Sequence, residues 1–169
     1  SSPEEAYQMI QDAFWYSEKY KTPVLFRPTT RVCHAYANIE NPEYKGPKEY
    51  EGFQKDSKKW VIFPKLSYSS HARMEERNVE IGKDFSQYAW NKVEGSSSEK
   101  AIIASGISYA YAKEYLKNHE DIRLIKIATA YPFPEDFVMT ALEGVKEVIC
   151  LEELSPYIEE QVLKLAGRY

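Results

Sequence analysis

The feature that most constrains the fold is a regular alternation of strand-like and helix-like segments between Ala101 and Tyr169. The successive segments are an apolar run at 101–105, helical spacing over 109–118, a second strand at 122–127, a helix over 134–144, a third strand at 148–151 and a last helix over 157–166. Strands that alternate with helices of this length imply right-handed crossovers and a parallel sheet. The sequence therefore predicts a small parallel-sheet α/β domain over residues 99–169.

Composition and charge exclude several classes of protein. The hydrophobic fraction of 43% supports a real core, and a formal net charge of -4 with both signs well mixed leaves no basic stripe for nucleic acid. There is no apolar run long enough for a membrane span and no leader pattern. Cys33 and Cys150 are far apart, which favours a reducing cytoplasm over a disulfide scaffold. No spacing of histidines and cysteines is typical of a metal site, so we expect none.

The first 34 residues have the pattern of one helix and one strand. Ser2 is a suitable N-cap, Glu5 lies where a capping box needs a glutamate, and apolar residues recur at helical spacing, which predicts a helix over 3–20. A short apolar strand is expected at 24–26. One helix and one strand cannot bury their apolar faces alone. We therefore expect a segment that completes a sheet lying upstream, with a natural N-terminus after processing as the alternative.

Residues 35–98 are expected to form a linker. Between Thr29 and Lys59, turn-forming residues and a tyrosine-rich stretch at 44–50 interrupt any regular pattern, and a stretch of this length without structure is typical of an inter-domain crossover. The apolar run at 60–63 predicts an extended segment held against the core. A mostly polar helix follows over 67–90, and the Gly95–Glu99 segment is a flexible connector.

The turns that follow the three strands are the natural ligand-binding edge of an open α/β sheet. They contain single glycines and serines rather than a phosphate fingerprint, which favours turns and helix caps over an anion site. Glu152 and Glu153 are adjacent at a strand end and point to opposite sides, so they do not form a catalytic pair. A capping or interface role is expected for them.

Arg31 and His34 form a polar cluster with two threonines just beyond the predicted strand. A guanidinium, an imidazole and two hydroxyls suit the binding of a carboxylate. The alternative, and the commoner arrangement, is a loop that hydrogen-bonds its own backbone. Cys33 lies between them, but no upstream helix N-terminus would activate its thiol as a nucleophile.

Several stretches of the chain resemble the large (alpha) subunits of indolepyruvate:ferredoxin oxidoreductases, within the 2-oxoacid:ferredoxin oxidoreductase family. The matching stretches, in the family's order, are Ser2-Pro-Glu-Glu-Ala-Tyr, Lys21-Thr-Pro-Val-Leu-Phe-Arg-Pro-Thr-Thr-Arg-Val-Cys-His, Trp60-Val-Ile-Phe-Pro, Ile103-Ala-Ser-Gly-Ile-Ser-Tyr, Lys126-Ile-Ala-Thr-Ala-Tyr-Pro-Phe-Pro and Leu151-Glu-Glu-Leu-Ser-Pro-Tyr-Ile-Glu-Glu-Gln. The resemblance implies that residues 1–34 close a pyrimidine-type thiamin-binding domain, that 35–98 link it onward, and that 99–169 form a transketolase C-terminal-like α/β domain.

The resemblance also implies an activity, cofactors and partners. Such enzymes oxidatively decarboxylate aryl 2-oxo acids to acyl-CoA, and the whole enzyme is implied to use thiamin diphosphate, magnesium, iron–sulfur clusters and coenzyme A. The cofactor supplies the electron sink while the protein positions it. The implied partners are the remaining domains of the alpha subunit, a beta subunit and ferredoxin. No nucleic acid or membrane partner is implied.

This sequence departs from the whole enzyme in what it lacks. It has no Gly-Asp-Gly segment for magnesium and diphosphate, no Cys-x-x-Cys run for clusters, and not the part of the first domain that carries the thiamin-activating glutamate. We therefore expect the segment to bind no cofactor alone, to be inactive in isolation and to act mainly as scaffold and interface. The match of the Arg-x-Cys-His run makes Arg31 and His34 substrate- or cofactor-proximal candidates, although the family usually has Ser where Cys33 stands. The alternative is a self-contained α/β binding module of another transketolase-like enzyme.

Overall fold

The computed structural model describes residues 1–40, 52–95, 99–119 and 121–167. The tyrosine-rich stretch at 44–50 and residues 96–98 of the expected connector lie outside these ranges. The helices are α1 (Pro3–Tyr20), α2 (Thr30–Cys33), α3 (Ser57–Trp60), α4 (Pro64–Ser86), α5 (Gly106–Tyr115), the 3-10 turn η1 (Leu116–Asn118), α6 (Glu135–Ala141) and α7 (Tyr157–Ala166). The strands are β1 (Lys92–Glu94), β2 (Lys100–Ser105), β3 (Arg123–Ile127) and β4 (Glu147–Leu151).

The four strands form one mostly parallel sheet in the order β1-β3-β2-β4. Strand β2 pairs in parallel with β3 and β4, and the register places Ile103 opposite both Ile125 and Cys150. The predicted parallel-sheet α/β fold is therefore confirmed. The sheet also has an antiparallel edge strand, β1, which pairs with β3 and precedes residue 99. Three residues with a single apolar side chain, Val93, carry too little pattern to predict a strand.

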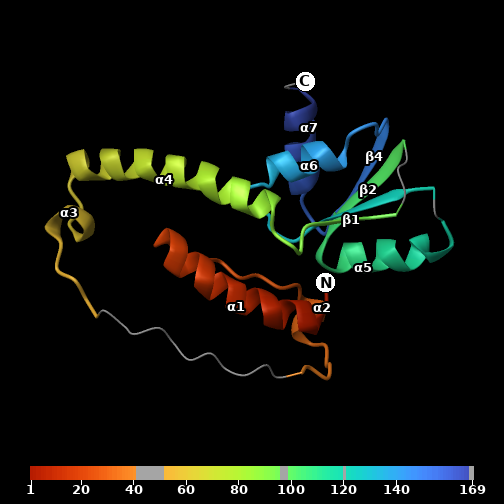
Figure 1. Ribbon diagram of the computed structural model, residues 1–169, viewed down its shortest axis with the longest axis horizontal. Helices are drawn as coiled ribbons and strands as arrows, with labels where there is room; N and C mark the ends of the chain where they lie inside the picture. Colours follow the sequence, from red (N-terminus) through yellow and green to blue (C-terminus); the bar gives the residue numbers. More distant parts are fainter. Residues whose placement is uncertain (41–51, 96–98, 120, 168–169) are drawn as a thin grey trace.

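Helices cover both faces of the sheet, as Figure 1 shows. On one face α5 packs over Ile102, Ala104 and Leu124, and on the other α6 and α7 pack over Ile103 and Ile125. These sets follow from the period of two along a strand, which sends alternate residues to opposite faces. Nearly continuous burial along β2 and β3 is the signature of strands covered on both sides. The core of the molecule thus lies in the C-terminal half of the chain.

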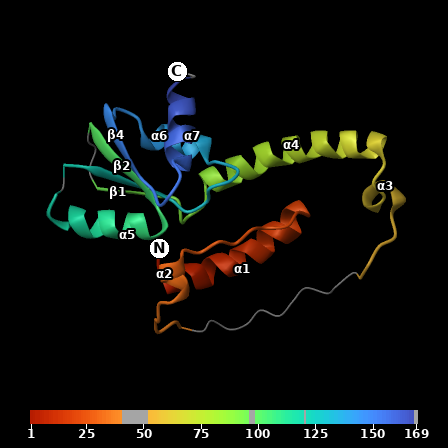
Figure 2. The ribbon, with the colours of Figure 1, turned by 180° about the vertical axis from the view of Figure 1, so that it is seen from behind.

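Helix α1 has the bounds that the sequence predicts. The Ser2 hydroxyl accepts a hydrogen bond from the Glu5 backbone N–H at 3.3 Å, and Lys21 ends the helix in the left-handed region with a φ of 49°. Glu5 does not complete a capping box, because its carboxylate points instead to the sheet. Figures 1 and 2 show α1 below the long helix α4, with both extending away from the sheet.

The strand predicted at 24–26 is absent. The backbone from 23 to 29 has no regular structure and returns alongside α1 to α2 (Figure 1). Leu25 is 90% exposed. The prediction was wrong because a strand needs a neighbour for its backbone hydrogen bonds, and none of the described strands lies beside this segment.

The apolar run at 60–63 is also not held against the core. Trp60 ends α3, and its indole N–H donates to the Gln54 carbonyl at 2.9 Å. Ile62 is 88% exposed, and Phe63 is exposed as the N-cap of α4. Pro64 begins this helix rather than ending the extended run, because proline fits the first helical position. The polar helix is thus confirmed, with its bounds at 64–86 instead of 67–90.

Candidate functional site

Arg31 and His34 lie at the surface on and just after the short helix α2. The Arg31 guanidinium carbon is 5.7 Å from the centre of the Tyr111 ring on α5, and Arg31 forms no ion pair with a described residue. His34 is the C-cap of α2, and its backbone N–H donates to the Thr30 carbonyl at 3.1 Å. The two side chains are three residues apart, which is about one helical turn. Both side chains are exposed to solvent.

Thr29 connects this cluster to the end of strand β2. A Cβ on Gly106 would lie 2.8 Å from the Thr29 Cγ2 methyl group, so the two residues are in direct contact. Gly106 has a φ of 51° and begins α5 directly after β2. The Thr29 hydroxyl is buried without a hydrogen-bond partner among the described residues. The fold thus brings the upstream polar cluster to the carboxyl edge of the sheet, where open α/β sheets bind ligands.

A buried ion pair, which the sequence reasoning missed, fixes α1 on the sheet. Lys126 Nζ on β3 lies 2.7 Å from Glu5 Oε2 on α1, and the two side chains are only 4% and 5% exposed. The Ser1 hydroxyl also donates to Glu5 Oε2, at 2.5 Å. A buried charge needs such a partner, because an unpaired ion in the interior is strongly unfavourable.

Two aromatic rings enclose the Lys126 ammonium. Its Nζ lies 4.9 Å from the centre of the Tyr109 ring and 5.2 Å from that of Trp90. The Tyr109 hydroxyl donates to Glu94 Oε1 at 2.5 Å, and Lys113 contacts the same carboxylate at 2.8 Å. Ring faces attract cations, so this cage stabilises the charged amine where water is excluded.

The pKa shifts in this cluster follow from burial and from these contacts. Burial raises the pKa of Glu5, but hydrogen bonds from Lys126 and Ser1 outweigh it and hold the pKa below its usual value. Burial lowers the pKa of Lys126, and the ion pair with Glu5 opposes this. Burial and the Glu94 carboxylate raise the pKa of Tyr109 to about 12. The cluster therefore holds opposite charges in fixed places and serves as a clamp between elements.

A signal for this clamp was present in the sequence. Lys126 stands between two isoleucines in a strand whose other residues are apolar except for Arg123, and it shares its face of the sheet with Leu124. A lysine at such a position demands a buried acceptor. The identity of that acceptor could not be deduced, because Glu5 is far away in the sequence and has an adequate local role as a capping-box residue.

The turns after the strands are built by side chains that satisfy backbone groups. The Glu152 carboxylate accepts from the backbone N–H groups of Ile158 and Glu159 at 2.6 and 3.0 Å, so it caps the start of α7. After β3, the Asn91 side chain accepts from the Ala128 N–H at 2.7 Å and donates to the Thr129 hydroxyl at 2.8 Å. The expected capping role of Glu152 is confirmed, since its carboxylate caps α7.

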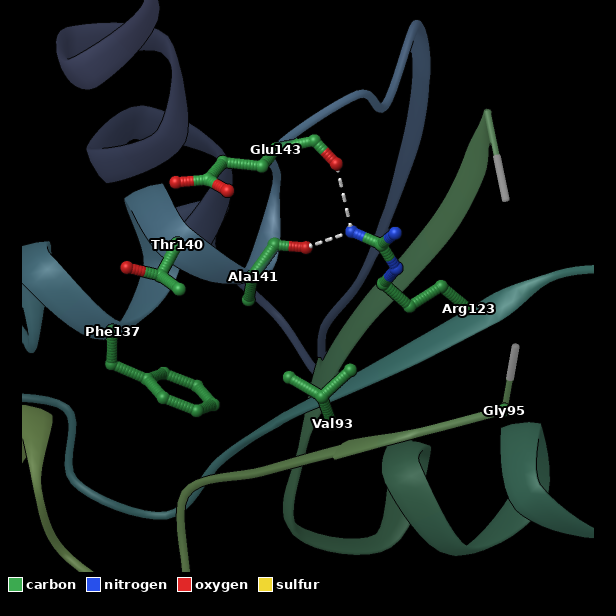
Figure 3. A pocket seen from close by; sticks show the side chains of 7 residues that line it. All are labelled: Val93, Gly95, Arg123, Phe137, Thr140, Ala141 and Glu143. Carbon is green, nitrogen blue, oxygen red and sulfur yellow. Dashed lines mark hydrogen bonds between the residues drawn. The ribbon is translucent and has the colours of Figure 1, made fainter. Parts of the chain in front are cut away.

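A pocket of about 440 Å³ opens beside β1 and α6, as Figure 3 shows. Arg123 on β3 lies at its edge and donates from one terminal nitrogen to the carbonyls of Ala141 and Glu143, at 2.6 and 3.1 Å. These carbonyls lie at the C-terminal end of α6, where the helix dipole is negative and backbone acceptors lack intrahelical partners. Arg123 is thus a helix-capping residue.

The two cysteines differ in their surroundings. Both are free, and Cys33 is exposed. Burial, with the nearby carboxylates of Glu152 and Glu159, raises the pKa of Cys150 to about 11, so its thiol stays protonated at neutral pH. Within the described ranges, no three histidine, cysteine, aspartate or glutamate side chains converge to hold a metal ion. Across the same ranges, no helix is both long and apolar enough to cross a membrane.

Sequence comparison finds relatives that match nearly the whole of this chain. No protein-family profile matches the chain. It is 36% identical over 170 residues to the indolepyruvate oxidoreductase subunit IorA of Thermococcus kodakarensis, across 96% of this chain and 26% of that subunit. The IorA of Methanothermobacter thermautotrophicus is 33% identical across 99% of this chain and 28% of that subunit. This chain is homologous to one segment of IorA.

The chain spans about a quarter of the length of these IorA relatives. The IorA of Archaeoglobus fulgidus shows the same coverage at 29% identity. Among solved structures, a 2-oxoglutarate:ferredoxin oxidoreductase from Magnetococcus marinus, with 2-oxoglutarate, coenzyme A and succinyl-CoA bound, aligns with 87% of this chain and 24% of its own. Its sequence identity is 19% and its TM-score is 0.49. The similarity to IorA therefore rests on the sequence matches.

Proposed function

We propose that this chain serves as a segment of an indolepyruvate:ferredoxin oxidoreductase, which oxidatively decarboxylates aryl pyruvates to aryl-acetyl-CoA. The observation that carries the proposal is the 29–36% identity to IorA subunits over nearly the whole chain. The enzyme would use thiamin diphosphate, magnesium, iron–sulfur clusters and coenzyme A, with ferredoxin as electron acceptor. A cytoplasmic location stays a prediction from the two separate cysteines.

The residues of this segment do not fit the redox and metal groups of that reaction. Two cysteines cannot supply the four thiolates of an iron–sulfur cluster, and the described residues form no metal-binding group. The role that we propose for the segment is therefore to hold elements in place and to contact the remaining domains of the subunit and a beta subunit.

The geometry of α1 supports the scaffold role. The Glu5–Lys126 pair anchors the first turn of α1 on the sheet, and the Tyr16 ring packs edge-on against Phe85, with centroids 5.2 Å apart, beside α4. These contacts leave large apolar side chains in the first 25 residues open to solvent, among them Phe14 and Leu25. Exposed apolar surface of this kind is typical of a protein interface.

Arg31 and His34 are the residues that we propose to lie near substrate or cofactor. Their side chains are exposed, lack carboxylate partners among the described residues and stand beside the carboxyl edge of β2 through the Thr29–Gly106 contact. A guanidinium and an imidazole about one helical turn apart can bind the carboxylate of a 2-oxo acid. Positioning of that group, rather than proton or electron transfer, is the role that the geometry favours.

The test of the function uses the complete alpha subunit with this segment in place, assembled with its beta subunit. Indolepyruvate should drive coenzyme A-dependent ferredoxin reduction in the complex, and the 169-residue chain alone should give none. Arg31→Gln should raise KM for indolepyruvate by about tenfold, the value of one lost charge-assisted contact. Lys117→Gln, on the surface turn after α5, is the matched control. The proposal would be refuted if the complex acted on other 2-oxo acids but not on aryl pyruvates.

A second experiment tests the interface role. Leu25→Glu should weaken association of the alpha and beta subunits, or open the alpha subunit to protease, because it places a charge on an apolar contact. Tyr115→Glu changes another exposed large side chain, on α5, and serves as the control. Equal effects of the two substitutions, or no effect of Leu25→Glu, would contradict the assignment of this surface to an interface.

A further inference from the structure

The end of the molecule farthest from the sheet contains a pocket of about 510 Å³ that is lined mainly by positive charge. The pocket lies between the C-terminal end of α1, the α3 region and the N-terminal half of α4, which Figure 2 shows beside one another. The charged residues that line it are Lys21, Lys58, Lys59, Arg73, Arg77 and Asp56. Five cations thus surround one pocket in a chain whose formal net charge is -4.

Most of these cations lack a carboxylate partner. Lys58, Lys59, Arg73 and Arg77 form no ion pair with any residue in the described ranges, whereas Lys21 pairs with Glu18 at 3.1 Å. The Asp56 carboxylate accepts from the Lys58 backbone N–H at 2.8 Å, as the N-cap of α3.

Several lysines elsewhere in the fold are paired with carboxylates. Lys113, Lys126 and Lys146, for example, each contact a carboxylate within 3 Å. The pocket is therefore a local concentration of positive charge that the described protein groups do not neutralise.

Arg77 has unused hydrogen-bond capacity in this pocket. Its Nε is buried without a partner among the described residues, and one terminal nitrogen makes a long contact of 3.5 Å to the Tyr20 carbonyl. A guanidinium has five N–H donors, and buried donors are normally satisfied. Arg73, one turn earlier on α4, hydrogen-bonds Ser70 at 2.8 Å, its one hydrogen-bond partner within the described part of the chain. Two arginines four residues apart lie on the same side of α4 and repel each other, and an anion bound between them would relieve this repulsion.

We propose that this pocket binds the phosphate groups of a small phosphorylated ligand. Arginine forks match phosphate geometry, and lysines add point charges around it. A concave site of this volume is the size of small-molecule pockets. Lys21 follows α1, whereas Lys58 and Lys59 lie in α3, and only the fold brings them together with the two arginines of α4. The inference does not rest on the proposed oxidoreductase function.

Titration of the full 169-residue chain with inorganic pyrophosphate tests the proposal. Isothermal calorimetry should show saturable binding at one site, which weakens as salt concentration rises. The double substitution Arg73→Gln and Arg77→Gln should weaken binding by at least about tenfold, because it removes charge-assisted hydrogen bonds. Lys117→Gln, a surface lysine outside the pocket, should change the affinity by less than about twofold.

Two measurements keep the result independent of any folding defect. Lys58→Gln with Lys59→Gln changes only exposed residues and should also weaken binding, and the Arg77 Nε–H resonance in ¹⁵N NMR should shift as pyrophosphate saturates the site. Coenzyme A is the comparison ligand. If coenzyme A binds more tightly than pyrophosphate, the ligand is of nucleotide type. If the two bind equally, the pocket recognises the phosphates alone. Absence of saturable binding, or equal affinity in the wild type and both double variants, overturns the proposal.

Discussion

The Nζ atom of Lys126 on β3 lies 2.7 Å from a carboxylate oxygen of Glu5 on α1, inside a cage formed by Trp90 and Tyr109. The contact joins the first turn of the chain to the middle of the sheet. Removing one partner of such a pair leaves an uncompensated buried charge, which costs more than the pair contributes.

The substitution Glu5→Gln should therefore destabilise the chain strongly. We expect the free energy of unfolding to fall by about 3–5 kcal/mol, the usual cost of breaking a buried ion pair. Urea denaturation followed by tryptophan fluorescence measures it, because Trp90 contacts the lysine. The double variant Glu5→Leu with Lys126→Met should recover much of the loss. Equal stability of Glu5→Gln and the wild type would show that the pair contributes nothing.

The same pair should make stability depend on pH in a defined direction. The pKa of Glu5 is held below 4.5, so its ionised form stabilises the fold above that value, and this contribution is lost as pH falls through the lowered pKa. The stability difference between the wild type and Glu5→Gln should thus be constant near neutral pH and narrow below about pH 4.5. Denaturation series at several pH values measure it, with exposed Glu114→Gln as the control. A difference that widens in acid would contradict the assignment.

Gly106→Ala should destabilise the junction between β2 and α5. Gly106 has a φ of 51°, which costs about 1–2 kcal/mol for a residue with a Cβ, and the new methyl group would lie 2.8 Å from Thr29 Cγ2. Adding Thr29→Ser removes that methyl group and should recover the part of the stability lost to the clash. The part lost to the unfavourable backbone conformation should remain lost. Thermal unfolding of the wild type, Gly106→Ala and the double variant separates the two effects. Full recovery in the double variant would exclude backbone strain as a cause.

Glu152→Ala should weaken the start of α7. The carboxylate accepts from two backbone N–H groups, and loss of a helix cap costs about 1 kcal/mol. The neighbouring Glu153→Ala is the matched control, because Glu153 is exposed and caps no helix. Chemical denaturation should rank the Glu152 variant below both the control and the wild type. Equal losses in the two variants would indicate a general charge effect in place of a cap.

Local patterns in the sequence were sufficient to predict the helices that are stabilised by local contacts and the strands that are buried along their length. The helix at 3–20, the strands β2 to β4 and the helices between them were predictable from capping residues and apolar periodicity. The strand expected at 24–26 does not form, since an apolar triplet carries no information about whether a neighbouring strand exists. The edge strand β1 was missed for the converse reason, because its pairing with β3 compensates for a weak pattern.

The residues of the candidate sites show the same division. The sequence by itself determined the α/β architecture and the polar character of Arg31 and His34, because strand periodicity and residue chemistry are local properties. Only the tertiary structure decided that Thr29 meets Gly106, that Glu5 neutralises Lys126 and that Arg77 joins lysines from two other segments. Such contacts depend on how the chain returns through space, and their favourable energy exists only after the intervening residues have been ordered.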